Sequence, residues 1–272
     1  MKALNGSPSE AIEEYAVWGG IPRYWELRRQ EKNLKEAAIR HILDRHGVLH
    51  EEPSRLFLDD SRDTVQMSSL ITMVASGVNR LSEIASRMEK PATHLGRPLQ
   101  RLIDLGYLKR EIPFGSSVRN TKKSLYKVAD PFMNFFFRYV MPERSLLELG
   151  HARKVYQELV LKDFPVYCSS IWENLCRDAI PALLNDKLYS PGMRWWGTSG
   201  IDKKQVEIDI ISSSLDKSQL IAGEVKWSSS VNIFKLIEEL NDKIERIPLF
   251  KHQKIQKVLF LKTKPGESYK DV

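Results

Sequence analysis

The stretch QVEIDIISSSLDKSQLIAGEVKW, residues 205–227, contains two alternating apolar and polar segments separated by a polar turn. A period of two is typical of β-strands, and the Ser, Asp and Lys residues between the segments favour a turn. We therefore predict a β-hairpin whose turn is centred near Asp216. If that hairpin is symmetric, Asp209 lies directly opposite Glu224 on the neighbouring strand.

The same hairpin symmetry predicts the positions of the remaining side chains. Glu207 is expected opposite Lys226, on the face that carries Glu224. The reverse face is expected to be apolar, with Val206, Ile208 and Ile210 against Ile221, Val225 and Trp227. A continuous apolar face favours this register over a shift by one residue.

Two carboxylates that face each other destabilise a sheet unless a cation offsets their repulsion. Aspartate and glutamate oxygens are suitable ligands for Mg²⁺ or Mn²⁺. Lys226, two residues beyond Glu224, could orient a water molecule or stabilise charge on a phosphate. The alternative is that these charges form a solvated strand face, because the pattern acid-x-Lys is common on exposed strands.

The bulk composition bounds the class of protein. The chain has 272 residues, 42% of them hydrophobic and 28% charged, and a formal net charge of +7. These values are ordinary for a globular protein of one large or two to three small domains. A basic balance suits a polyanionic partner such as nucleic acid. With no run of 18 apolar residues and no signal-peptide core, we expect a cytoplasmic protein without a membrane partner.

Residues 64–128 have the pattern of a winged helix-turn-helix. Three short amphipathic segments, the last of which ends before Gly106, are followed by two strand-like segments, YLKREIP and SLYKVAD. The turn between those strands, residues 115–123, is rich in Gly, Ser, Asn and Lys. Three helices and a two-stranded ribbon are the arrangement of this DNA-binding motif. Its use for protein contact, with solvated charges, remains the alternative.

The rest of the chain gives coarser expectations. Residues 8–49 are predicted to be helical, with Ser9 as the first cap and a break at residues 19–22. The aromatic run PFMNFFFRYVMP (131–142) is predicted to be a buried helix, although aromatic side chains can also stack on bases. From about residue 145 the order is helix, three strands, helix, strand, with a helix break near Phe164-Pro165, which indicates an α/β unit.

Several isolated residues have ordinary explanations. Cys168 and Cys176 are eight positions apart on one predicted helix, too far for a disulfide, and are expected to be buried thiols. We expect the histidines to be surface or capping residues rather than metal ligands: His41, His46 and His50. Trp195 and Trp196 are expected to pack one in the core and one at its rim.

A family resemblance covers nearly the whole chain. The stretches that carry it are YAVWGGIPRYWEL (15–27), RLSEIASRM (80–88), RLIDLGYLKREIPFG (101–115), SLYKVADPFMNFFFRYV (124–140), RSLLEL (144–149), IWENLCRD (171–178), RWWG (194–197), VEIDII (206–211) and GEVKW (223–227). In this order they resemble the C-terminal part of a family of predicted archaeal and bacterial AAA-type ATPases. The tail of that family is a domain of unknown function, DUF234.

The resemblance implies an α+β or α/β protein of three parts. Residues 1–60 resemble the helical lid of an AAA ATPase, residues 61–142 a winged helix-turn-helix, and residues 143–272 the PD-(D/E)xK nuclease superfamily with a mixed sheet flanked by helices. In that superfamily an acid on the first helix, an aspartate on the second strand and E-x-K on the third strand bind metal and cut DNA. The matching residues are Glu173, Asp209, Glu224 and Lys226.

The chain also departs from the family. It has no Walker A sequence, no GxGxxG after a strand and no ATPase core, so we expect no ATP site in this chain. We expect either a fragment of a longer ATPase or a stand-alone relative that uses an ATPase core from another chain. Pro98 lies inside the predicted recognition helix and is expected to kink that helix or delay its start.

Two functions follow. The first is a DNA-binding, Mg²⁺- or Mn²⁺-dependent nuclease in which Asp209, Glu224 and Glu173 hold the metal and Lys226 positions water. The second is a non-catalytic DNA- or protein-binding regulatory module that partners an AAA-type ATPase, and either could form a homo-oligomer. The residues expected to contact DNA are His94, Arg97, Gln100 and Arg101 of the third helix and Arg119, Lys122 and Lys123 of the wing.

Overall fold

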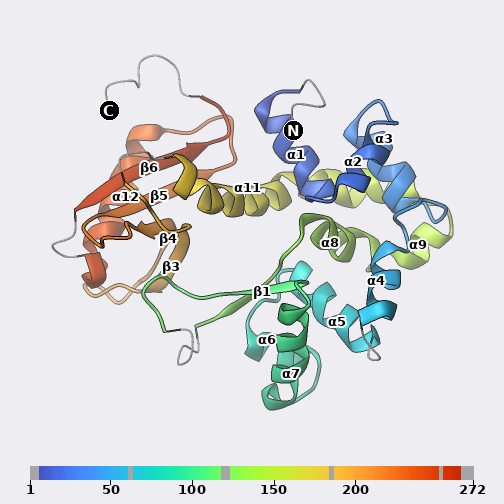
Figure 1. Ribbon diagram of the computed structural model, residues 1–272, viewed down its shortest axis with the longest axis horizontal. Helices are drawn as coiled ribbons and strands as arrows, with labels where there is room; N and C mark the ends of the chain where they lie inside the picture. Colours follow the sequence, from blue (N-terminus) through green and yellow to red (C-terminus); the bar gives the residue numbers. More distant parts are fainter. Residues whose placement is uncertain (1–5, 61–63, 118–122, 184–186, 251–253, 265–272) are drawn as a thin grey trace. The chain divides into compact units, whose positions relative to one another are not determined.

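A computed structural model describes residues 6–60, 64–117, 123–183, 187–250 and 254–264. Within them the chain mixes α-helices with one two-stranded and one four-stranded sheet (Figure 1). It divides into two compact units, the first made of residues 1–111 and 124–167 and the second of residues 112–123 and 168–272. No helix among the described residues is long and apolar enough to cross a membrane.

The first unit is mainly helical. Its elements are α1 (Pro8–Trp18), α2 (Pro22–Arg28), α3 (Leu34–Ala38), α4 (Glu52–Asp60), α5 (Thr64–Ala75), α6 (Leu81–Arg87), α7 (Ala92–Asp104), β1 (Leu108–Glu111), β2 (Leu125–Val128), α8 (Pro131–Phe135), α9 (Arg144–Glu148), α10 (Ala152–Val155) and the first turns of α11 (Leu161–Leu183). Single π-helical turns, residues 39–43, 136–140 and 156–160, follow α3, α8 and α10.

Helix α1 begins with a capping box, although not at the serine that the sequence suggested. The hydroxyl of Ser7 accepts a hydrogen bond from the Glu10 N–H, and the Glu10 carboxylate accepts one from the Ser7 N–H. Pro8 then occupies the first helical position, where a missing N–H costs nothing. The prediction of Ser9 as the cap is therefore wrong by two residues. The predicted break is confirmed, since α1 ends at Trp18.

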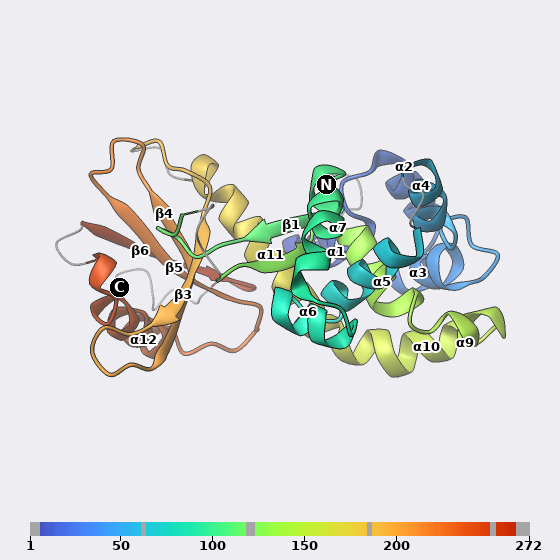
Figure 2. The same ribbon diagram turned by 90° about the horizontal axis from the view of Figure 1, so that it is seen from below.

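Helices α5, α6 and α7 are followed by the antiparallel pair β1–β2, in the order that the sequence predicts (Figure 2). Their apolar stripes are buried, and Gly106 ends α7 with a φ of 79°, as expected for a glycine after a helix C-terminus. Pro98 lies inside α7, which begins at Ala92, so the proline does not delay the start of the helix.

The aromatic run 131–142 forms the core of the first unit, as predicted. Phe132, Phe135, Phe136 and Phe137 are at most 1% exposed. The hydroxyl of Tyr167 lies 2.7 Å from the Ala16 carbonyl oxygen and 2.8 Å from that of Pro131. These aromatic side chains are therefore packing residues and offer no surface on which bases could stack.

The second unit contains a mixed sheet in the order β3-β4-β5-β6, formed by β3 (Met193–Thr198), β4 (Gln205–Ser213), β5 (Leu220–Lys226) and β6 (Ile255–Leu261). The first three strands are antiparallel neighbours, whereas β5 and β6 are parallel and joined through α12 (Ile233–Glu245) (Figure 1). Cys176 and Ile180 of α11 pack on one face of the sheet, and Leu240 of α12 packs on the other.

A β-bulge changes the predicted faces of β4. Trp195 pairs with Ile208 and Met193 with Ile211, so two residues of β4 stand opposite one residue of β3. Ile208 consequently packs on the α12 side, whereas Ile210 packs on the α11 side with Ile221 and Val225. The expectation that Val206, Ile208 and Ile210 share one face was wrong, because simple alternation does not survive a bulge. Both faces of the sheet are apolar and covered.

Three smaller expectations have mixed outcomes. Helix α11 runs through Phe164-Pro165 without a break, since a proline removes one N–H but need not end a helix. The apolar segment KVLFLKT (257–263) predicts a short buried strand, but β6 is half-exposed because it lies at the edge of the sheet. Cys168 and Cys176 are buried and free, as predicted, and burial raises the pKa of the Cys176 thiol, which keeps it protonated and inert.

Candidate functional site

The register of β4 and β5 matches the symmetric hairpin. The ladder consists of Ile210↔Gly223, Ile211↔Ala222, Ser212↔Ile221 and Ser213↔Leu220, and it ends at the pair next to Asp209 and Glu224. Beyond that point β5 continues to pair with β6 alone. Glu207 does not pair with Lys226 as predicted and instead forms an ion pair with Arg194 of β3. The site therefore begins where two strands stop pairing.

Position 223 has room only for glycine, because strand β6 lies too close for a larger side chain. A Cβ built on Gly223 would lie 2.6 Å from Cγ2 of Val258 and 2.9 Å from the Val258 carbonyl oxygen on β6. Real Cβ atoms essentially never approach other atoms this closely. The glycine thus lets β5 and β6 come together immediately before Glu224.

Asp209 holds the opened end of the ladder. It lies in the bulge of β4, and its Oδ2 accepts a hydrogen bond of 2.9 Å from the backbone N–H of Val225. The carboxylate of Asp209 thereby pairs with a backbone N–H of β5 just beyond the last residue pair of the β4–β5 ladder. Asp209 is buried, and its Oδ1 has no hydrogen bond among the described residues.

Glu224 is 1% exposed and contacts two lysines. Lys226 Nζ lies 3.3 Å from Glu224 Oε2 and 3.9 Å from Asp209 Oδ2, so it bridges the two carboxylates. Lys243 of α12 lies with its Nζ 2.7 Å from the other oxygen of Glu224, Oε1. Both carboxylate oxygens of Glu224 are therefore paired with ammonium groups.

The charges perturb one another in the expected directions. Burial, followed by the negative charge of Asp209, raises the pKa of Glu224, and the two lysines only partly offset this effect. Burial alone would lower the pKa of Lys226, but the charges of Asp209 and Glu224 outweigh burial and raise it. Lys226 is therefore a cation at neutral pH and cannot act as a general base.

Glu173 reaches this region through an arginine. Nη2 of Arg177, one helical turn further along α11, lies 3.0 Å from Glu173 Oε2, and its Nε donates a hydrogen bond of 2.8 Å to the Asp209 carbonyl oxygen. Glu173 also helps to raise the pKa of Lys226. These contacts place α11 beside the bulge of β4.

The three acids do not form a closed ligand set in this structure. Within the described part of the chain, three ligand atoms that all lie within 4.8 Å of one another occur only in a different group, His50, Glu51 and Glu148. Asp209, Glu224 and Lys226 converge, whereas Glu173 joins them through Arg177. The structure thus brings Asp209, Glu224 and Lys226 together, whereas Glu173 pairs with Arg177 beside them.

The residues predicted to contact DNA belong to both units. His94, Arg97, Gln100 and Arg101 are exposed on α7 in the first unit, and Gln100 donates to Asp104. Arg119 and Lys122 lie outside the described residues, and Lys123 is exposed in the second unit. In that unit the N–H of Phe114 donates to the Arg194 carbonyl oxygen of β3, and its ring packs against the sheet core. The loop after β1 is thus attached to β3.

Sequence reasoning missed Lys243 and Arg177. Lys243 follows the buried positions Leu236 and Leu240 at helical spacing, so a lysine on the apolar stripe of α12 was the available signal. Arg177 lies four residues after Glu173, the spacing of an ion pair on one helix face. Neither pattern indicates which residue of the sheet the side chain contacts, Glu224 for Lys243 and Asp209 for Arg177.

Comparisons with known proteins confirm part of the expected family. Residues 136–243 match the DUF234 family, described as archaeal and bacterial proteins of unknown function. The chain is also 24% identical over 267 residues to the uncharacterized protein MJECL04 of Methanocaldococcus jannaschii, an alignment that covers 95% of this chain and 58% of that protein. No solved structure gives a significant match. The AAA-type ATPase context stays a prediction.

Proposed function

We propose that the chain binds DNA and hydrolyses phosphodiester bonds with a divalent metal ion held at the end of the β4–β5 ladder. The observation that carries the proposal is the convergence of two buried carboxylates, Asp209 and Glu224, with Lys226 at one point of the sheet. This is the arrangement that the resemblance to PD-(D/E)xK nucleases implies, with a winged helix-turn-helix formed by α5–α7 and the β1–β2 pair.

The donor set fits Mg²⁺ or Mn²⁺. Asp209 and Glu224 both offer hard carboxylate oxygens. Burial, and after it the charge of Asp209, raises the pKa of Glu224, and a divalent ion would offset both effects. Asp209 and Glu224 would hold the ion, and Glu173 would contribute after leaving Arg177. When bound, the metal supplies Lewis-acid stabilisation of the phosphate and lowers the pKa of a water ligand.

The protein's own groups have separate roles. Lys226, kept cationic by the two carboxylates, would position the attacking water and stabilise charge on the phosphate. Arg177 fixes the backbone of Asp209 and so holds the carboxylate at the ladder end. On α7, Arg97 and Arg101 would contact DNA phosphates or base edges.

A plasmid-nicking assay tests this function. Purified protein is incubated with supercoiled DNA in Mg²⁺, Mn²⁺ or EDTA, and nicked and linear products are measured. We expect metal-dependent nicking that falls by at least about 100-fold in Asp209→Asn and Lys226→Met, in line with the loss of a preorganised charge at the transition state. Glu238→Gln and Lys235→Met, two exposed positions of α12, are the matched controls and should retain activity.

Circular dichroism and thermal unfolding of each variant separate loss of activity from loss of fold. If nicking survives both Asp209→Asn and Lys226→Met, the activity belongs to another site or to a contaminant. Complete absence of nicking in the wild type with either metal would reject the nuclease function.

The non-catalytic alternative has one observation in its favour. Three acids, Asp209, Glu224 and Glu173, are offset by three cations, Lys226, Lys243 and Arg177, so the site is charge-balanced without a metal. Such a fold would serve as a DNA- or protein-binding platform, with an AAA-type ATPase as partner. It predicts salt-sensitive DNA binding with no cleavage in either metal.

A further inference from the structure

His50 has a buried imidazole ring, and the hydrogen-bond partner of one ring nitrogen fixes the protonation of that nitrogen. It is 1% exposed and lies two residues before the start of α4. Its Nδ1 lies 2.9 Å from the Ile42 carbonyl oxygen. A carbonyl oxygen can only accept, so Nδ1 must carry the proton and Nε2 presents a lone pair when the ring is neutral. Nε2 is itself buried and has no hydrogen-bond partner in the described structure.

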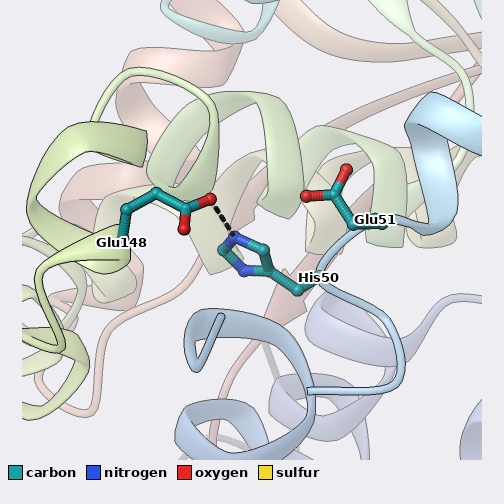
Figure 3. Close-up of side chains that lie close together, drawn as sticks. All are labelled: His50, Glu51 and Glu148. Atoms are coloured by element: carbon teal, nitrogen blue, oxygen red, sulfur yellow. Dashed lines mark ion pairs between the residues drawn. The ribbon is translucent and has the colours of Figure 1, made fainter. Parts of the chain in front are cut away.

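Two carboxylates lie close to the His50 ring. Nε2 is 3.9 Å from Glu148 Oε1, and one ligand atom from each of His50, Glu51 and Glu148 lies within 4.8 Å of the others (Figure 3). A separation of 3.9 Å is too long for a hydrogen bond. It is within the sum of a Zn–N and a Zn–O bond, about 4.2 Å. A metal ion between the atoms would therefore satisfy Nε2 where a proton alone does not.

Arg144 and Arg45 place positive charges nearby. The guanidinium of Arg144 forms an ion pair with Glu51 Oε1, and its Nε lies 3.7 Å from Glu148 Oε1. Nη1 of Arg45 also donates a hydrogen bond of 2.6 Å to the backbone carbonyl oxygen of Glu148. Arg144 Nε and His50 Nε2 both approach Oε1 of Glu148, so an ion at Nε2 would share that carboxylate with Arg144. Arg144 then acts as an outer partner that orients the ligands.

We propose that His50, Glu51 and Glu148 form a binding site for a divalent transition-metal ion such as Zn²⁺. A neutral imidazole nitrogen with two carboxylates is a donor set for Zn²⁺ and its transition-metal neighbours rather than for Mg²⁺. The hydrogen bond from Nδ1 to the Ile42 carbonyl oxygen orients the ring, as the non-ligating nitrogen of a metal-bound histidine usually does. The ion would join the end of α9 to the segment before α4, both in the first unit.

The test uses the full chain without a histidine tag, stripped of metal with a chelator and dialysed. Zn²⁺ is titrated against a chromogenic competitor, and Co²⁺ is titrated while its visible absorption is recorded. We expect one equivalent of Zn²⁺ and a Co²⁺ spectrum typical of nitrogen and oxygen ligands. His50→Gln should weaken Zn²⁺ binding by more than about 100-fold, since loss of even an outer partner costs about 10–100-fold.

Because His50 is buried, Glu148→Gln is the second variant. Its side chain is half-exposed, so the substitution should leave the fold intact and lower Zn²⁺ affinity by at least about tenfold. His46→Gln, an exposed histidine four residues earlier, is the matched control and should bind Zn²⁺ like the wild type. Asp209→Asn should also leave this binding unchanged, which separates it from the proposed nuclease centre.

Thermal unfolding supplies a readout that needs no activity. Zn²⁺ should raise the melting temperature of the wild type and of His46→Gln, but not of Glu148→Gln, because only a ligand bound to the folded state stabilises it. Absence of stoichiometric binding by the wild type would overturn the proposal. Binding that Glu148→Gln and His50→Gln leave unchanged would overturn it as well.

Discussion

At the scale of single residues, the centre of the second unit depends on how a buried carboxylate is neutralised. Glu224 is almost fully buried, and its two oxygens are paired with Lys226 from its own strand and Lys243 from α12. An unpaired buried charge costs several kcal/mol, so the two lysines are structural requirements whether or not a metal binds.

Lys243→Met tests this pairing. It leaves Glu224 Oε1 without its cation, and we expect a loss of about 1–3 kcal/mol in the free energy of unfolding at neutral pH. Urea unfolding measures the loss, with Lys235→Met on the exposed face of the same helix as control. Combining Lys243→Met with Glu224→Gln should recover most of the stability, because the unpaired charge is removed. A double variant as unstable as the sum of its parts would contradict the pairing.

Gly223→Ala tests the close approach of β5 and β6. Its Cβ would clash with both the side chain and the carbonyl of Val258, so we expect a loss of about 1–3 kcal/mol. Thermal or urea unfolding measures it. Gly96→Ala in α7 is the matched control, since nothing lies within 4 Å of its Cβ and alanine favours a helix by about 0.5–1 kcal/mol. Unchanged stability in Gly223→Ala would show that β6 moves away freely.

At the scale of elements, one arginine connects three helical segments of the first unit. Arg138, in the π-helical turn after α8, forms an ion pair with Asp163 of α11 at 2.6 Å. The same guanidinium donates to the Ala75 carbonyl oxygen at the end of α5, where a cation also suits the helix dipole. Tyr139 donates its hydroxyl proton to Asp163. The helices are therefore held by polar contacts as well as by the aromatic core.

The acid sensitivity of this connection follows from the pKa of Asp163. Burial would raise that pKa, but the hydrogen bonds from Arg138 and Tyr139 outweigh burial and hold it below the ordinary value of 3.8. The folded state therefore binds this proton less tightly than the unfolded chain does. The stabilisation is complete above about pH 4 and is lost as the pH falls through the folded-state pKa.

Asp163→Asn should remove this contribution. We expect the variant to be less stable than the wild type at pH 6, with the difference narrowing below about pH 4, where the wild-type carboxyl is protonated. Urea midpoints measured between pH 2.5 and 6 check this, with Glu238→Gln as an exposed control. A difference that stays constant over that range would show that the carboxylate charge is not what stabilises the contact.

At the scale of the whole molecule, the chain combines a net charge of +7 with an exposed polar face on α7. Its two units are not sequential blocks, because residues 112–123 leave the first unit after β1 and belong to the second. The proposed DNA contacts consequently come from both units, α7 from one and Lys123 from the other.

DNA binding should depend steeply on salt. If Arg97 neutralises one phosphate, Arg97→Gln should reduce the slope of log K against log salt by about 1 and weaken binding to all sequences about equally. Fluorescence anisotropy with a labelled duplex at several NaCl concentrations measures the slope. Lys235→Met removes the same charge from α12 and should leave the slope unchanged. Equal slopes for the wild type and Arg97→Gln would remove Arg97 from the interface.

Local patterns predicted most elements because they depend on neighbours in sequence. The helices of residues 64–104, the strands of residues 193–226 and the burial of the aromatic run all follow from spacing and turn residues. The hairpin register was right because turn symmetry fixes it. The faces of β4 were wrong because one bulge residue shifts alternation, and nothing in QVEIDIIS marks where the extra residue is placed. The prediction that His41, His46 and His50 lie at the surface or cap helices was partly wrong. Of these three, His41 and His50 are buried, whereas His46 is exposed.

The sequence by itself determined the hairpin, its register and the presence of Asp209, Glu224 and Lys226 beside one another, since strand pairing is a local matter of period and turn. Only the tertiary structure decided that Lys243 pairs with Glu224, that Arg177 stands between Glu173 and Asp209, and that His50 faces Glu148. These contacts join residues 19 to 98 positions apart. These contacts depend on how helices pack against other elements. The spacing of apolar residues within one segment does not determine which element that segment packs against.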